Sequence, residues 1–219
     1  MGPRERRPAI HHGRLTQNAG FCFWCFGFKI EPEQTSANLK LRRRIRLLVV
    51  LLALGVIAYW GWDFWRERRF DPLILAASNR YQIDPALVKA VVWRESRFDP
   101  DARGRAGELG LMQIRADAAS EWAAAERIAS FEHRSCLDPA TNTLAGAWYL
   151  KKLLLRYQDT DNPAAYALAD YNAGRSNVLK WLQGPAATQS GVFVRQIGFP
   201  ATRDYVRAIL RRADDYRPM

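Results

Sequence analysis

An uncharged apolar run constrains this chain most, because it divides the sequence into two parts that cannot fold around one core. No Asp, Glu, Lys or Arg occurs between Leu47 and Trp62. Extended over residues 47–65, the run approaches the roughly 20 residues that a helix needs to cross a bilayer. Its far end carries aromatic residues of the kind found at membrane interfaces, namely Tyr59, Trp60, Trp62 and Trp65. We therefore expect residues 47–65 to form a single transmembrane helix.

The flanking charges predict how this helix is oriented. Five Lys or Arg residues lie within residues 40–46, on the amino side only, and such clusters stay in the cytoplasm. A buried helix of a soluble protein is one alternative, but charge at a single end argues against it. A cleaved signal peptide is the other, yet the run lacks a small-x-small cleavage site and ends in bulky aromatic residues. We expect an uncleaved anchor with the carboxyl-terminal part outside the cytoplasm.

The strong positive charge of the chain is concentrated before this helix. Residues 1–46 contain ten Lys or Arg and three Asp or Glu, so they contribute +7 of the net charge of +11. We expect these residues to form a basic cytoplasmic tail without regular structure. Excess basic charge can indicate nucleic-acid binding, but here most of it serves membrane topology, so no nucleic-acid partner is predicted.

The cysteines give weak signals. Cys22 and Cys25 form one C-x-x-C pair, and a tetrahedral zinc site would need two further ligands. His11 and His12 are adjacent in a stretch that contains glycine and proline, so we predict no metal. Cys136 has potential disulfide partners only before the membrane segment, and we expect it to be a free or buried thiol.

After the anchor, residues 66–219 have the pattern of a mostly helical domain. Asp or Asn followed by Pro predicts a capped helix start, because the side chain can cap and proline suits the first helical position. The longest predicted helix runs from Pro139 to about Tyr157, and residues 97–113 are predicted to be irregular. The four predicted starts are Asp71-Pro72, Asp84-Pro85, Asp138-Pro139 and Asn162-Pro163.

Glu95 is an acid on the apolar face of the helix that starts at Pro85. It continues the i, i+3, i+4, i+7 spacing set by Val88, Val91 and Val92, so it is expected to face inward in the last turn. Desolvation raises the pKa of a buried carboxyl, which could then donate a proton near neutral pH. The alternative is an internal ion pair. Its candidate partners are Arg94, Arg97 and Arg103.

Three blocks of sequence favour the catalytic interpretation. They read ESRFDPDA at 95–102, GELGLMQ at 107–113 and ALADYNAG at 167–174. In order and spacing they resemble the lytic transglycosylases of the soluble-lytic-transglycosylase (SLT) type, whose blocks read approximately ES-x-F-x-P-x-A, G-x-x-GLMQ and A-x-A-x-YNAG. The resemblance extends from about Asp71 to Tyr205. It implies a lysozyme-like (goose-type) helical domain behind one transmembrane helix.

The resemblance also implies a reaction and a site. In this family a single Glu, here Glu95, acts as general acid and then base, cleaving the β-1,4 bond between N-acetylmuramic acid (MurNAc) and N-acetylglucosamine (GlcNAc). The muramic acid 6-hydroxyl attacks in place of water and leaves a 1,6-anhydro end, without metal or cofactor. The implied partners are peptidoglycan strands and a bacterial cytoplasmic membrane. The predicted substrate-binding residues are Gln113, Tyr171, Asn172, Tyr205, Met112 and Ser96.

Three residues depart from the family's pattern. Gly104 replaces a common Ser, Glu108 stands where a small residue is usual, and Ala116 replaces a frequent Pro. We expect Glu108 to be a solvent-exposed loop residue. Two alternative functions remain, a lysozyme-like hydrolase that uses Glu108 as a base and a non-catalytic glycan-binding scaffold. Product mass separates hydrolysis from transglycosylation, because hydrolysis adds water.

Overall fold

The computed structural model describes residues 32–217. The chain divides into two compact units, and the boundary falls between Ala53 and Leu54. Most of the predicted basic tail lies outside the described residues, as do the C-x-x-C pair and the adjacent histidines. Helix α1 (Pro32–Arg68) begins in the first unit, and its last turns belong to the second.

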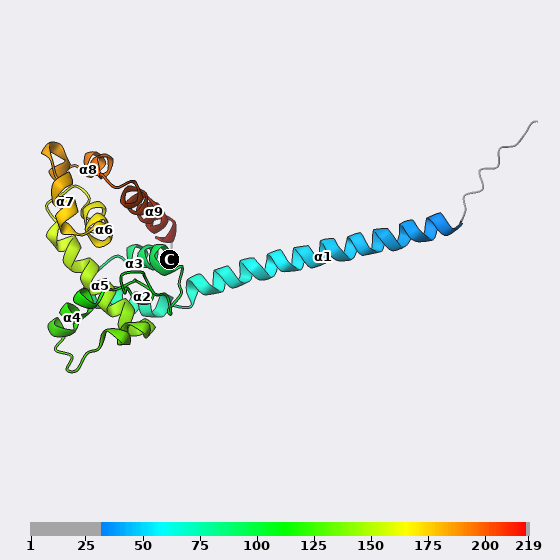
Figure 1. Cartoon of the computed structure of the whole chain (residues 1–219), viewed down its shortest axis with the longest axis horizontal. Coiled ribbons are helices and arrows are strands. Elements are labelled where there is room, and N and C mark those ends of the chain that lie inside the picture. The colour runs from blue at the N-terminus through cyan, green and yellow to red at the C-terminus, as the bar shows by residue number, and fades with distance from the viewer. Residues whose placement is uncertain (1–31, 218–219) are drawn as a thin grey trace, which may run out of the picture. The chain divides into compact units, whose positions relative to one another are not determined.

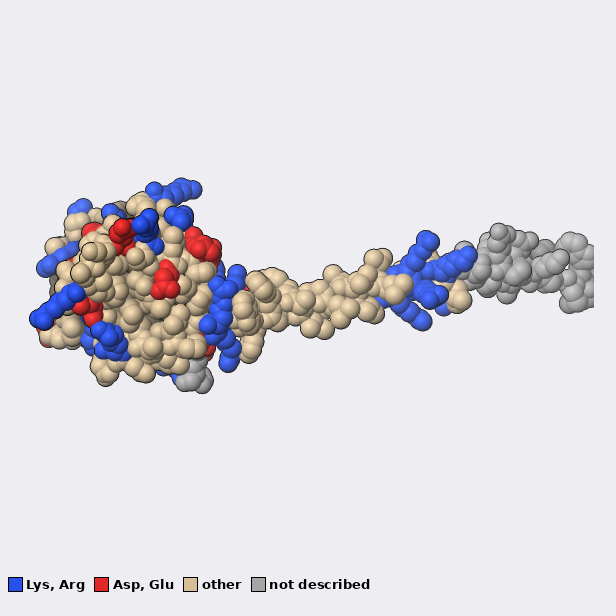
Figure 2. Space-filling view, turned by 90° about the horizontal axis from the view of Figure 1, so that it is seen from below, with Lys and Arg blue, Asp and Glu red and all other residues tan. Residues whose placement is uncertain are grey.

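Helix α1 has the length and composition of a membrane-spanning helix. Its large apolar side chains from Leu39 to Trp65 have between 47% and 71% of their surface exposed within the described part of the chain. Basic residues gather on its amino-terminal part, and the stretch that follows is uncharged (Figure 2). The helix starts at Pro32, so residues 32–46 differ from the predicted tail without regular structure. Proline suits a first turn, and the Leu, Lys and Arg residues that follow favour helix.

The second unit is built from helices, and its described residues contain no β-sheet, only isolated bridges around Leu109. Helix α3 packs along α9, and α5 packs against α2, α4 and α6 (Figure 1). The elements are α2 (Asp71–Tyr81), α3 (Pro85–Ser96), α4 (Ala116–Ala125), η1 (His133–Leu137), α5 (Pro139–Arg156), α6 (Pro163–Ala173), α7 (Arg175–Trp181), η2 (Gly184–Ala187), α8 (Ser190–Gln196) and α9 (Pro200–Tyr216).

The predicted helix starts are confirmed in position, but only two have the predicted cap. Asp84 accepts a hydrogen bond from the Ala86 N–H at 2.9 Å, and Asp138 accepts one from the Thr141 N–H at 2.8 Å. Asn162 precedes α6 without a side-chain cap. At α2 the capping position belongs to Phe70, because Asp71 is already helical and its carboxylate pairs with a lysine of α3.

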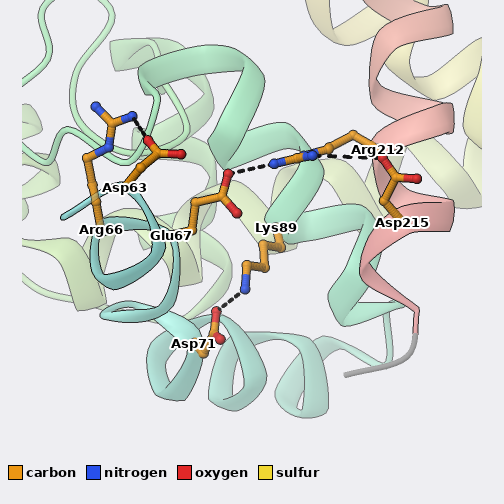
Figure 3. A network of polar contacts seen from close by, with 7 residues as sticks. All are labelled: Asp63, Arg66, Glu67, Asp71, Lys89, Arg212 and Asp215. Atoms are coloured by element: carbon orange, nitrogen blue, oxygen red, sulfur yellow. Dashed lines mark hydrogen bonds and ion pairs between the residues drawn. The ribbon is translucent and has the colours of Figure 1, made fainter. Parts of the chain in front are cut away.

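That pair belongs to a polar network that joins α1, α2, α3 and α9 (Figure 3). Nζ of Lys89 lies 2.6 Å from Oδ1 of Asp71, and the Lys89 side chain is only 3% exposed. At the end of α1, Glu67 lies 2.6 Å from the guanidinium of Arg212 on α9, which also faces Asp215 at 3.8 Å. The last turn of α1 is therefore held to the helical domain by an ion pair.

Candidate active site

Glu95 lies in the last turn of α3, where the chain leaves the helix. Arg97 and Phe98, which follow the last helical residue Ser96, both have positive φ angles, of 53° and 63°, so the backbone turns sharply away. The Glu95 side chain is half-buried, and Tyr205 of α9 donates a hydrogen bond from its hydroxyl to Oε1 at 2.5 Å. The tight packing of α3 against α9 brings the two residues together.

The surroundings of Glu95 favour its protonated form. Burial raises its pKa from 4.5 to about 7, and the nearby negative charge of Glu108 adds to this. The Tyr205 hydrogen bond and the positive charge of Arg94 act in the opposite direction. Burial also raises the pKa of Tyr205 well above its usual value, so that hydroxyl remains a neutral donor. Glu95 can therefore hold a proton near neutral pH.

The predicted alternative, an ion pair at Glu95, is wrong for the described part of the chain, in which Glu95 makes no salt bridge. The guanidinium of Arg94 lies over the Tyr205 ring at 5.4 Å, and that of Arg97 lies over Trp93 at 4.1 Å. Both arginines therefore stack on aromatic rings beside the site.

The GELGLMQ block forms a tight turn that depends on glycine. Gly110 has φ of +73°, and a Cβ there would collide with the Asn142 amide and the Cys136 carbonyl oxygen. Gln113 has φ of +48°, and its Nε2 donates to the carbonyl oxygens of Ala102 at 3.0 Å and Gly110 at 2.9 Å. Its amide therefore satisfies loop backbone groups, while its side chain also lines the cleft described below.

Asn142, in the first turns of α5, holds this turn in place. Its fully buried amide accepts from the Met112 N–H at 2.7 Å and donates to the carbonyl oxygens of Leu109 and Cys136 at 2.8 and 2.7 Å. Tyr171 donates its hydroxyl to the Met112 carbonyl oxygen at 2.7 Å. In the sequence, the signal for Asn142 is a polar residue on the inward face of α5. Both backbone groups of Met112 are thus fixed from other helices.

A cleft of about 440 Å³ opens beside Glu95. It contains four residues that were predicted from sequence, Glu95, Gln113, Tyr171 and Asn172, whereas Tyr205 contacts Glu95 without lining the cleft. Sequence reasoning missed the contributions of α4 and α5, which come from parts of the chain outside the three blocks. The complete lining is Glu95, Glu108, Gln113, Ile114, Arg115, Asp117, Ala118, Tyr149, Asp170, Tyr171, Asn172, Ala173 and Gly174.

Two predicted substrate-binding residues do not lie at this cleft. The Ser96 hydroxyl donates to the Leu111 carbonyl oxygen at 2.8 Å, which ties the end of α3 to the glycine turn. Met112 is fully buried against Gly146 of α5. A Cβ at position 146 would collide with the Met112 sulfur. Both belong to the recognised blocks, but in the structure the Ser96 hydroxyl bonds to the backbone and the Met112 side chain packs against α5.

Glu108 is also placed differently from the expectation of a solvent-exposed loop residue. Its side chain is half-buried and lines the cleft together with Glu95. Its Oε2 accepts a hydrogen bond from the Ala106 N–H at 3.0 Å, so the turn itself fixes the carboxylate. The cleft therefore contains a second carboxyl near the first.

Comparison with known proteins agrees with this architecture. Residues 72–192 match the family described as the transglycosylase SLT domain, and the chain belongs to that family. It is 37% identical over 118 residues to membrane-bound lytic murein transglycosylase F of Desulfosudis oleivorans, covering 52% of this chain and 24% of that protein. It is 31% identical over 161 residues to the soluble lytic murein transglycosylase of Escherichia coli K12, covering 71% and 24%.

A solved structure shows the same fold. The 70 kDa soluble lytic transglycosylase SLT70 of Escherichia coli superposes with a TM-score of 0.61 at 27% identity, over 68% of this chain and 24% of that one. The predicted SLT-type helical fold is therefore confirmed. In each of these three comparisons the chain spans about a quarter of the length of the matched protein.

Proposed function

We propose that this chain is a membrane-anchored lytic transglycosylase that cleaves peptidoglycan strands between MurNAc and GlcNAc without hydrolysis. One observation carries the proposal. Glu95 is a half-buried carboxyl with a pKa of about 7 at a polar cleft, hydrogen-bonded to a neutral tyrosine and without a salt bridge in the described residues. The relatives of the chain include lytic murein transglycosylases, both soluble and membrane-bound.

The proposed reaction uses Glu95 twice. The protonated carboxyl gives its proton to the glycosidic oxygen, and the bond to the muramic acid anomeric carbon breaks. The resulting carboxylate then takes the proton of the muramic acid 6-hydroxyl as that oxygen attacks the same carbon, which closes the 1,6-anhydro ring and returns the proton to Glu95. Because the nucleophile belongs to the same sugar, its effective concentration is high.

Tyr205 suits both halves of this cycle. Its hydroxyl can donate to the carboxyl oxygen whether Glu95 is protonated or ionised, and the bond is stronger to the anion. After the first proton transfer it therefore stabilises the carboxylate that must act as base. We assign Glu95 as the catalytic residue and place Tyr205 behind it as a positioning residue. Gln113, Tyr171 and Asn172 are proposed to line the substrate cleft.

The test is mass spectrometry of purified peptidoglycan digested by the full-length protein in detergent micelles, beside a Glu95→Gln variant. Anhydro-muropeptides from the wild type alone are expected. Reducing-end products would instead establish a lysozyme-like hydrolase, the second candidate, which the carboxyl of Glu108 in the cleft favours. A folded protein that binds strands without releasing products would be a glycan-binding scaffold.

We further propose that α1 anchors the domain on the outer side of a bacterial cytoplasmic membrane, with residues 1–46 inside. The basic amino-terminal flank, the exposed apolar stretch and the membrane-bound relative support this orientation. Protease added to spheroplasts should degrade residues 66–219 and spare a tag at the amino terminus. Protection of the domain would reverse the assigned topology.

A further inference from the structure

Two of the residues that depart from the family's pattern lie against each other in one turn. A Cβ built on Gly104 would collide with Oε2 of Glu108 and would lie 2.9 Å from the Cβ of Glu108. It would also lie 2.9 Å from Oε1 of Gln113. A side chain at position 104 therefore cannot coexist with the Glu108 carboxylate in its present place. The absence of a side chain at one position makes room for the acid at the other.

The same turn holds Glu108 rigidly. The Gly104 N–H donates to the Glu108 carbonyl oxygen at 2.8 Å, and the Ala106 N–H donates to Oε2 at 3.0 Å. Gly107 supplies a φ of +86°, which glycine tolerates best. Leu109, the next residue after Glu108, forms antiparallel bridges with both Arg103 and Ile114. The backbone of Glu108 is thus held by the turn and its carboxylate by the Ala106 N–H, with no salt bridge to Glu108 among residues 32–217.

Burial is the main cause of the raised pKa of Glu95, and from this place the charge of Glu108 raises that pKa further through space. The groups that oppose it are the hydroxyl of Tyr205 on α9 and the guanidinium of Arg94 on α3. The other titratable or charged groups that line the cleft lie in the loop before α4 and on helices α4, α5 and α6. They are Arg115, Asp117, Tyr149, Asp170 and Tyr171.

We propose that Glu108, admitted to the cleft by Gly104, is a positioning residue for the cleavage reaction that keeps the proton on Glu95 until a glycosidic oxygen is bound. A carboxylate disfavours ionisation of a second one nearby, so with Glu108 in place Glu95 stays a proton donor at a higher pH than it would without it. Glu108 itself exchanges no proton and forms no bond with the substrate. This inference rests on the proposed function, in which Glu95 is the general acid.

The first experiment compares pH profiles of kcat/KM for the full-length protein and Glu108→Gln, measured as release of anhydro-muropeptides. Without the second charge, the basic limb should move to lower pH. Activity at pH 8 should fall roughly two- to fivefold, while activity at pH 5 should stay within about twofold of wild type. Glu132→Gln removes the same charge from an exposed site outside the cleft and should leave the profile unchanged.

The second experiment tests the coupling with Gly104. Gly104→Ala should displace the carboxylate and shift the basic limb in the same direction as Glu108→Gln. The double variant Gly104→Ala with Glu108→Ala should lose less activity than Gly104→Ala and Glu108→Ala measured singly and combined, because the collision with Oε2 has been removed. Additive effects would contradict a shared role for the two residues.

Infrared titration of the Glu95 carboxyl gives a readout that does not need turnover. The protonated-carboxyl band that is absent in Glu95→Gln should titrate at lower pH in Glu108→Gln than in wild type. An unshifted band, or an equal loss of activity at every pH, would overturn the inference. If the band shifts in Glu108→Gln as expected but the wild type releases no anhydro product, the proposed function fails while the proton-holding role of Glu108 stands. Reducing-end products that vanish in Glu108→Gln would make it a base instead.

Discussion

Two ionisable side chains on helix α3 differ in how their charge is compensated. Lys89 is buried and forms an ion pair with Asp71 at 2.6 Å, within the network that joins α3 to its neighbours (Figure 3). Glu95, at the end of the same helix, is half-buried, faces the neutral hydroxyl of Tyr205 and has Glu108 nearby. A compensated charge stabilises the fold, whereas an uncompensated carboxyl can change its protonation at a physiological pH.

The largest expected effect of this difference is on catalysis. Glu95→Gln keeps the shape of the side chain but cannot donate or accept the proton, so release of anhydro-muropeptides should fall at least about 10³-fold. The thermal midpoint should stay the same or rise, because no charge is then desolvated. Glu132→Gln serves as the matched control. Activity of Glu95→Gln within tenfold of wild type would remove Glu95 from the mechanism.

The next effect is on the pH dependence of stability. The folded-state pKa of Glu95 is raised from 4.5 to about 7, so the folded protein binds a proton that the unfolded chain releases within this window. The free energy of unfolding should therefore fall as pH rises from 4.5 to 7. The upper bound of this fall is roughly 3 kcal/mol, and partial exposure of the Glu95 side chain makes it smaller.

Urea unfolding of the full-length protein across that pH window, followed by tryptophan fluorescence, measures this contribution. The difference between wild type and Glu95→Gln isolates one residue from the other titrating groups. The variant should be the more stable protein at pH 7, and the gap should close near pH 4.5. A gap that stays constant with pH would mean that Glu95 titrates normally.

At the compensated site, the expected effect is on stability alone. Asp71→Ala removes a carboxylate that pairs with the buried Lys89. Since Asp71 is itself partly exposed, the loss should be about 2–3 kcal/mol, below that of a fully buried pair. The thermal midpoint should drop by roughly 5–10 °C. The double variant Asp71→Ala with Lys89→Met should recover much of the loss. Activity per folded molecule at low temperature should not change, and a selective loss of turnover would break the proposed division between the two sites.

A smaller effect is expected from the hydrogen bond at the uncompensated site. Tyr205→Phe removes the donor that lowers the Glu95 pKa, so this pKa should rise further and the basic limb of the activity profile should move to higher pH. Loss of carboxylate stabilisation should lower kcat by about tenfold. The limb shift is opposite in sign to that expected for Glu108→Gln. Two shifts in the same direction would show that packing, and not charge, controls the profile.

The smallest effect belongs to the ion pair at the end of α1. Glu67→Gln weakens the contact with Arg212, whose side chain is 31% exposed, and should cost about 0.2–1 kcal/mol. Differential scanning calorimetry of the full-length protein at low and high salt measures it. The difference from wild type should shrink with added salt. A salt-independent loss would indicate that Glu67 acts through packing.

Local features of the sequence predicted the elements and the central acid. Proline after Asp or Asn predicted where four helices begin, because proline suits the first turn whatever the tertiary contacts are. Apolar spacing predicted that Glu95 faces inward, and three blocks in a fixed order predicted the family. The same reasoning assigned Asp71 as a cap, but its carboxylate pairs with Lys89, which lies on another helix.

The directions of the side chains within the recognised blocks needed the structure. Ser96 and Met112 were grouped with the cleft residues, but both point into the protein, while Glu108 was expected in solvent and lines the cleft. Their blocks lie in and around an irregular segment, where no helical or strand period relates position to facing. Backbone angles such as the positive φ of Gln113 decide the direction of each side chain there.

By itself, then, the sequence determined the apolar helix, the helical domain after it, the membership of the SLT family and an acid at the end of α3. The tertiary structure alone decided the state of that acid. Its pKa depends first on burial, then on Tyr205, which is 110 positions away in the chain, and also on Glu108, which a glycine admits to the cleft. Electrostatic effects depend on distance and burial in space, and neither quantity follows from separation along the chain.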